Sequence, residues 1–184
     1  MIKRCQLSNN TKAYVEEYEK ILKEMIDKMS SVVLTESISG SFITQMIPHH
    51  RAAIAMSENL LRYTTNIPLQ NIAENIISSQ KESIENMTMA FPECQCCINS
   101  PQELSCYKKK DECIMSNMFH EMNTACTNNS IDGNFIREMI PHHMGAVCMS
   151  ENALQYPLCP ELIPLLEQIV ISQKKGICQM RQLL

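Results

Sequence analysis

Apolar residues recur at three- and four-residue intervals along most of the chain, which is the spacing of one face of an α-helix. Between Thr11 and Val33, for example, Leu22, Met25 and Met29 fall on a single stripe. The composition, with 4 Gly and 5% aromatic residues, also favours helices over a sheet rich in turns. The pattern therefore predicts an all-α fold with helices at about 11–33, 41–63, 69–90, 105–126, 134–156 and 162–184.

The same pattern occurs twice, at a constant offset of 93 residues. Residues 42–61 read FITQMIPHHRAAIAMSENLL and residues 135–154 read FIREMIPHHMGAVCMSENAL, with thirteen of twenty positions identical. The offset continues beyond this segment without a gap, and ten of the 14 Met residues form equivalent pairs. We interpret this as an internal duplication of about 75 residues. It predicts one helical-bundle domain over 1–184, with a first repeat at about 11–90, a Cys-rich joint at about 91–106 and a second repeat at about 107–184.

Charge and hydropathy exclude several classes of partner. The net charge is -4 and no basic patch is present, so we expect no binding to nucleic acid. No run of about 18 apolar residues occurs, so we expect no insertion into membranes. Lys3 and Arg4 are not followed by the apolar stretch of a signal peptide, which predicts a cytoplasmic protein, or an exported one if a leader was removed. A homo-oligomer is left open.

The repeated segment carries a His–His pair between two Met residues. At about 100° per residue, Met46, His49 and Met56 share one face of a helix, with the small residue Ala53 among them. His50 lies at the edge of that face. An imidazole and two thioethers form a plausible partial ligand set for Cu(I). We therefore expect a copper site at the duplicated residues His49, His50, Met46, Met56, His142, His143, Met139 and Met149.

A proline precedes each His pair. Inside a helix, proline removes one hydrogen bond and clashes with the preceding turn, whereas near the first turn its cost is small. Pro48 and Pro141 therefore indicate one of two arrangements. Either the helices start late, close to the proline, or a kink aims the His side chains. Ser41 and Asn134 are plausible N-caps for the helices expected at 41–63 and 134–156.

The last helix of each repeat contains a glutamine within an apolar stripe. Gln80 interrupts the first stripe and Gln173 the second. A buried amide needs a hydrogen-bond partner. Metal-binding His residues usually have such a partner behind them. We therefore expect Gln80 and Gln173 to lie behind the metal ligands and to hydrogen-bond to a motif His.

The chain has 10 Cys, and they do not follow the duplication. Four lie in the joint, where two form a C-x-x-C sequence. These four thiols, alone or with Cys113, are compatible with a zinc site. A thiolate cluster for Cu(I), or disulfides formed in air, are the alternatives. The candidate cluster consists of Cys94, Cys96, Cys97 and Cys106.

The motifs resemble a known bacterial family. F-I-x-x-M-I-P-H-H-x-x-A, with a Met ten residues after the first Met, is similar to the signature of domain-of-unknown-function family 305. So is the later I-x-x-Q-x-x-x-I-x-x-M, which is 77–87 here and, with Val leading, 170–180. The resemblance covers nearly the whole chain. It implies a ferritin-like four-helix bundle in which two motif helices and two Gln helices pack around a pseudo-two-fold axis, with one extra helix per repeat as a cover.

The resemblance also implies copper, because some members are exported copper-binding or copper-resistance proteins that use His and Met. The chain departs from the family at three carboxylate positions. Ser39 stands where many members place an acidic residue, although the second copy has Asp132 there. Ser83 and Gly176 stand where a Glu often follows the Gln. The absent signal and the many Cys are further departures.

Three functions remain at this point. The first is a non-catalytic Cu(I)-binding protein for buffering, storage or delivery of copper, and we expect no enzymatic activity. The second is a structural or interaction bundle whose His/Met core is packed and holds no metal. The third is a ferritin-like di-iron oxidase, which needs Glu-x-x-His on facing helices. No Glu lies three residues before any of the 5 His residues, which disfavours iron.

Overall fold

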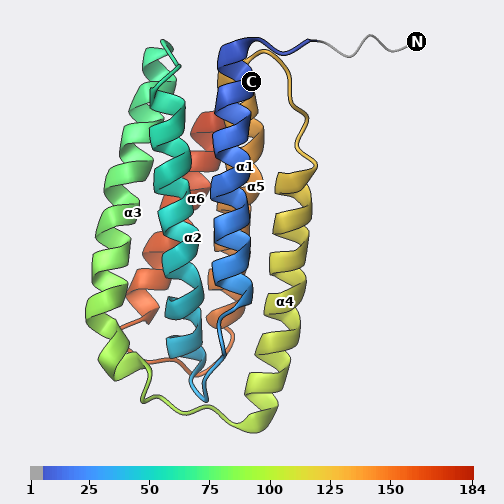
Figure 1. Cartoon of the computed structure of the whole chain (residues 1–184). Helices are drawn as coiled ribbons and strands as arrows, with labels where there is room; N and C mark the ends of the chain where they lie inside the picture. Colours follow the sequence, from blue (N-terminus) through green and yellow to red (C-terminus); the bar gives the residue numbers. More distant parts are fainter. Residues whose placement is uncertain (1–5) are drawn as a thin grey trace.

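The computed structural model describes residues 6–184 and confirms the all-α fold. The first five residues of the predicted domain lie outside this range. Figure 1 shows the helices running alternately up and down, and residues 6–184 contain no strand. No helix of the described chain is long and apolar enough to cross a membrane. The helices are α1 (Asn9–Ser30), α2 (Ile38–Leu61), α3 (Ile67–Cys94), α4 (Pro101–Asn123), α5 (Ile131–Ala153) and α6 (Ile163–Arg181).

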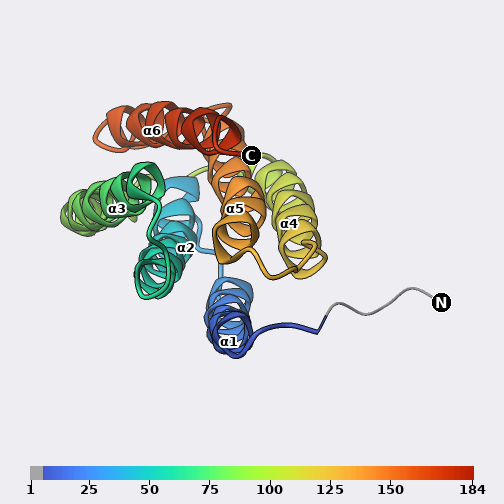
Figure 2. The ribbon, with the colours of Figure 1, turned by 90° about the horizontal axis from the view of Figure 1, so that it is seen from above.

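Four of the helices form the central bundle. α2 packs against α3 and α5, and α6 packs against α5 and α3. The remaining two helices are covers, since α1 packs on α2 and α4 packs on α5. Viewed along the bundle in Figure 2, α1 and α4 lie outside the group of four. The two motif helices and the two Gln helices therefore form the core of the bundle, as expected, and the ferritin-like relationship stays a prediction.

The motif helices begin earlier than expected. Their N-caps are Ser37 and Ser130, whose side chains accept from main-chain N–H groups three residues on. The N-caps predicted at Ser41 and Asn134 are therefore wrong. Both of these side chains are buried in the first turns, where each accepts a 3.0 Å hydrogen bond from the N–H of a preceding loop residue. They hold the loop against the helix instead of starting the helix.

The prolines consequently lie in helix interiors. Pro48 is the eleventh residue of the helix that begins at Ile38, and Pro141 holds the same place in the helix that begins at Ile131. The late start that we considered is therefore wrong. Each proline also removes one main-chain donor immediately before the His pair.

The joint between the halves is shorter than predicted. α3 continues through Pro92 to Cys94, and α4 already begins at Pro101. The start of α4 is fixed by a capping box, in which Ser100 and Glu103 each bond to the other's main-chain N–H. Only residues 95–100 connect the helices, so the expected loop at 91–106 is wrong at both ends.

A buried asparagine amide on each motif helix hydrogen-bonds to the main chain of its cover helix. Asn59 Nδ2 donates to the main-chain carbonyl of Tyr14 at 3.0 Å, and Asn152 Nδ2 donates to that of Tyr107 at 3.4 Å. Both tyrosines are buried and meet a second tyrosine ring edge-on. In both halves the hydrogen-bonded residues are 45 positions apart, so the two halves have the same local packing here.

One buried pair links α1 to the opposite half. Tyr14 Oη donates to Glu138 Oε2 at 2.6 Å. Burial raises the pKa of Glu138 to about 7, although the Tyr14 hydroxyl and the charge of Arg137 act in the opposite direction. At the equivalent position of the other half Gln45 replaces the carboxyl, and the Tyr107 hydroxyl has no hydrogen-bond partner. The halves therefore differ at this site.

We predict that Glu138→Gln removes a pH-dependent contribution to folding stability. With a pKa of 4.5 unfolded and about 7 folded, this carboxyl keeps its proton on folding, so the free energy of unfolding falls as the pH rises through that interval. Relative to the native protein, the variant should gain roughly 1–3 kcal/mol at pH 8 compared with pH 5. Urea denaturation at both pH values measures this.

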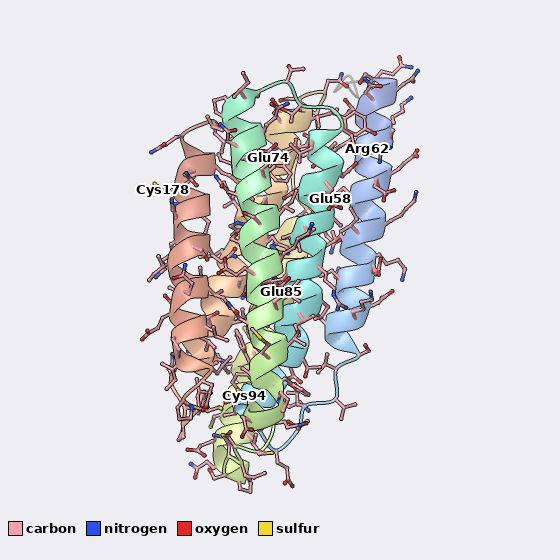
Figure 3. All side chains as sticks on the ribbon, turned by 90° about the vertical axis from the view of Figure 1, so that its left-hand side faces the viewer. Glu58, Arg62, Glu74, Glu85, Cys94 and Cys178 are labelled. Carbon is pink, nitrogen blue, oxygen red and sulfur yellow. The ribbon has the colours of Figure 1, made fainter. Side chains whose placement is uncertain are left out.

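Glu58→Gln provides the control, because Glu58 lies exposed on α2 (Figure 3). It should leave the pH dependence unchanged. An identical pH dependence in Glu138→Gln and native protein would contradict the raised pKa.

Candidate metal centre

The antiparallel packing of α2 on α5 brings the two His pairs together in the middle of the bundle. All four imidazoles are at most 2% exposed. The rings of His49 and His142 stack with their centroids 3.7 Å apart and their planes at 33°. His50 and His143 lie one residue further on, each 6.0 Å from its neighbour's ring centroid. The fold therefore brings the two repeated His pairs into one region.

Reciprocal hydrogen bonds fix the orientation of the central rings. His49 Nε2 lies 3.2 Å from the main-chain carbonyl oxygen of His142, and His142 Nε2 lies 3.2 Å from that of His49. A carbonyl oxygen can only accept, so each Nε2 carries the hydrogen and donates. Each Nδ1 is then a bare lone pair, and both Nδ1 atoms are buried without a partner. Leaving such an acceptor unsatisfied costs about 1–3 kcal/mol.

Burial keeps these imidazoles neutral. It lowers the pKa of His49 to about 4 and that of His143 to about 3. The pKa values of His50 and His142 are also well below the usual range, mainly through burial and further through the neighbouring imidazoles. Neutral imidazole is the form that binds metal ions, so the site has its binding form at neutral pH without a proton having to leave.

The outer His of each pair has a different environment in each half. His50 Nε2 lies 3.1 Å from Ser83 Oγ, within hydrogen-bond distance. His143 instead packs on Gly176, where an added Cβ would lie 3.0 Å from its Cδ2 and Nε2 atoms. Ser83 and Gly176 occupy the positions at which the family resemblance led us to note a missing Glu. A serine and a glycine there give the two outer imidazoles room without a negative charge.

The predicted Met ligands lie in the same buried core. Each is at most 2% exposed, on the same two helices as the imidazoles: Met46, Met56, Met139 and Met149. The other three Met pairs of the repeats are also buried, on α1, α3, α4 and α6. The centre of the bundle is therefore rich in thioethers, which are soft ligands.

The two glutamines are buried, but not bonded as expected. Gln80 and Gln173 line a cavity of about 120 Å³ between α3 and α6, together with His50 and Ser83. Both amide atoms of Gln80 and the Oε1 atom of Gln173 have no hydrogen-bond partner. Neither Gln80 nor Gln173 hydrogen-bonds to a motif His in the described residues, so that prediction is wrong. His49 and His142 bond to carbonyls instead, and His50 lies within hydrogen-bond distance of a serine. The cavity places free amide groups beside His50.

The four joint thiols are not brought together. Cys94 is buried, whereas Cys96 and Cys106 are exposed. Cys94 contacts the thiol of Cys159 from the loop before α6, and burial raises the pKa of both thiols. Figure 3 shows Cys94 near one end of the bundle, at the end of α3. The zinc site considered at Cys94, Cys96, Cys97 and Cys106 is not supported.

A ready-made site of three or more imidazole, thiolate and carboxylate ligands is also missing from the described residues. Over residues 6–184, no group of three or more His, Cys, Asp and Glu side chains is arranged to hold a metal ion. Glu138, the buried carboxyl nearest to the motif in sequence, bonds to Tyr14 instead. A di-iron centre is therefore disfavoured, and any metal in this core would depend on imidazole and thioether ligands.

No curated protein matches the chain. Solved structures do. CopM in the Cu(I)-bound form is 31% identical, with a TM-score of 0.56 over 78% of this chain and 93% of that one. CopM in the Ag-bound form, obtained by soaking, is 30% identical, with a TM-score of 0.58 over 78% and 92%. A fragment from Deinococcus radiodurans is 25% identical, with a TM-score of 0.55 over 79% and 94%, and is itself described as DUF305.

A family comparison agrees with the resemblance of the sequence motifs. The family model "Domain of unknown function (DUF305)" matches residues 16–91 and 41–184, which together cover most of the chain. The chain therefore belongs to the DUF305 family.

Proposed function

We propose that this protein binds Cu(I) as cargo in the core of the bundle and catalyses no reaction. The observation that carries the proposal is the pair of buried Nδ1 lone pairs on His49 and His142. The reciprocal bonds to carbonyl oxygens force these two atoms to be acceptors, and no protein donor reaches them. A soft cation would satisfy both.

The surrounding chemistry suits a soft, monovalent ion. Neutral imidazole and thioether ligands are preferred by Cu(I), and hard cations prefer oxygen ligands. Met46 and Met139 precede the central imidazoles by three residues and so lie on the same helical faces. The Cu(I)- and Ag-bound forms of CopM support the same choice of metal.

The cavity between α3 and α6 offers a way in. It reaches His50 from the side of the bundle and is lined by polar side chains, including Ser83, Gln80 and Gln173. A cation that loses water there would meet amide and hydroxyl oxygens before it meets imidazole nitrogen. We propose that this cavity is the entry path to the core site.

The role we favour is buffering, storage or delivery of copper. Within residues 6–184, no Glu and His side chains are grouped as a di-iron oxidase requires. A site buried among helices and reached through a narrow cavity retains its ion and limits access of oxidants. The duplicated His/Met segments would supply ligands from both halves, so that loading the site would also join the halves.

A packed core without metal is the second candidate, and one observation favours it. The rings of His49 and His142 already stack at 3.7 Å and exchange hydrogen bonds with each other's main chain. That arrangement would hold the halves together without an ion. The two functions differ in whether the Nδ1 atoms ever gain a partner.

We predict that Ag(I), a redox-inert substitute for Cu(I), shifts the methyl resonances of Met46 and Met139 in protein labelled at the methionine methyl groups. His49→Ala combined with His142→Ala should abolish these shifts, because both nitrogen ligands are gone. The measurement is an NMR titration. Because it observes the core methionine methyl groups directly, it distinguishes Ag(I) in the core from Ag(I) bound to the many thiols. Circular dichroism confirms that the double variant is folded.

His120→Ala is the matched control, because His120 is exposed on α4, away from the core. It should leave the shifts intact. Core methyl resonances that stay in place in native protein while the thiols are saturated would refute the metal site and favour the packed core.

We also predict that Gln80→Met stabilises the metal-free protein by roughly 1 kcal/mol, because it removes two unsatisfied buried polar atoms. The same change should slow Ag(I) uptake by the core, since the cavity loses its amide. Urea denaturation and stopped-flow mixing measure the two effects. Gln70→Met serves as control. The Gln70 amide donates to a main-chain carbonyl, so its loss should not stabilise the protein. A destabilised Gln80→Met would show that the amide is needed for folding instead.

A further inference from the structure

A groove of about 1000 Å³ lies between α4 and the α1–α2 loop, away from the imidazoles. Its walls combine apolar and polar side chains. The apolar ones include Met29, Val33, Leu34, Leu104, Met115 and Phe119. Val33 is 86% exposed on the rim, so the groove opens directly to solvent. Its volume matches the upper range of small-molecule sites.

Polar groups without partners line the inner part of the groove. Asp111 is only 1% exposed, and neither carboxyl oxygen has a hydrogen-bond partner. The hydroxyl of Tyr107 and the Oε1 atom of Gln45 are also buried and unpartnered. The Gln45 amide nitrogen donates to the sulfur of Met115 at 3.6 Å. Even if this amide turned over to donate to Asp111, one carboxyl oxygen and the tyrosine hydroxyl would stay unsatisfied.

The other half of the molecule provides an internal comparison. At the positions equivalent by the 93-residue offset, Tyr14 replaces Tyr107 and donates to Glu138 at 2.6 Å. Tyr18 stands in place of Asp111 and donates to the main-chain carbonyl of Met122 at 3.2 Å. Around α1, therefore, both tyrosine hydroxyls and the carboxyl have hydrogen-bond partners. In the groove the same three positions leave a carboxylate, a hydroxyl and an amide oxygen free.

The groove also has the charge for a cation. A buried carboxylate without a cationic partner is costly, and burial raises the pKa of Asp111 to about 6, although the Gln45 amide acts in the opposite direction. Glu36 and Glu112 also line the groove. The one lysine lining it, Lys108, pairs with Glu112 at 3.9 Å, and no ion pair to Asp111 is found in the described chain. A ligand cation is the partner that this carboxylate lacks.

We propose that this groove binds an amphipathic organic cation. Its ammonium group would lie against the Asp111 carboxylate and the Tyr107 hydroxyl, and its aliphatic body would lie along the apolar walls. Acceptors at the inner end match an ammonium donor, and hydrocarbon walls match the body. The site is separate from the His/Met core and does not depend on metal binding.

The probe is n-hexylammonium, titrated at pH 7.5 and followed by amide NMR shifts of the groove residues. We expect saturable binding, and binding of n-hexanol weaker by about tenfold or more, because the alcohol lacks the charge. This comparison uses the native protein and does not depend on any variant folding. Equal affinity for both compounds would overturn the proposal. So would the absence of shifts at hexylammonium concentrations up to about 10 mM, because even a weakly bound ligand of this size should bind by then.

Asp111→Asn tests the inner carboxylate, and Glu121→Gln is the control, because Glu121 is exposed on the same helix and does not line the groove. We expect Asp111→Asn to weaken hexylammonium binding by about tenfold or more and to leave hexanol binding unchanged. Glu121→Gln should change hexylammonium affinity by less than about threefold, because an exposed charge is screened by water. Unchanged hexylammonium affinity in a folded Asp111→Asn variant would show that the carboxylate does not recognise the ligand.

Discussion

The rest of the structure depends on the contact between His49 and His142 at the crossing of α2 and α5. Each ring donates to the main chain of the other helix, so the register of the two helices is fixed by the same groups that would bind an ion. Burying four imidazoles here is tolerable only because they stay neutral. α3 and α6 then close the core, with Ser83 and Gly176 leaving room for the outer rings.

This arrangement would link folding to the proposed metal binding. The hydrogen bonds stabilise the bundle, yet they aim one nitrogen of each central ring at the interior without a donor. A core built for stability alone would replace these rings with apolar side chains of similar size, since unsatisfied acceptors cost free energy. The cavity beside His50, with its free glutamine amide, carries the same kind of cost. Two such costs at one place are more readily explained by a ligand than by packing.

Much of this could be predicted from the sequence, because helical periodicity and the repeated segment are local signals. They predicted six helices, buried Met residues and adjacent His pairs. They did not predict the N-caps. Several polar residues near each helix start could serve as the cap, and Ser41 and Asn134, which we predicted, hold the preceding loops, whereas Ser37 and Ser130 cap the helices. Nor could the local signals predict the His–carbonyl bonds or the contact of Cys94 with Cys159, which depend on how separate helices meet.

The positions at which the halves differ show where the fold is free to change. Each central His ring donates to a main-chain carbonyl of the other half, so replacing either ring removes one of the two bonds across the crossing, and both copies have the residue. The contacts between each cover helix and the motif helices are less constrained. Gln45 of α2 is the equivalent of Glu138 of α5, and Tyr18 of α1 is the equivalent of Asp111 of α4. One combination is internally satisfied and the other is left open. A nearly symmetric core can therefore carry two unlike surfaces, because only the core residues must match each other.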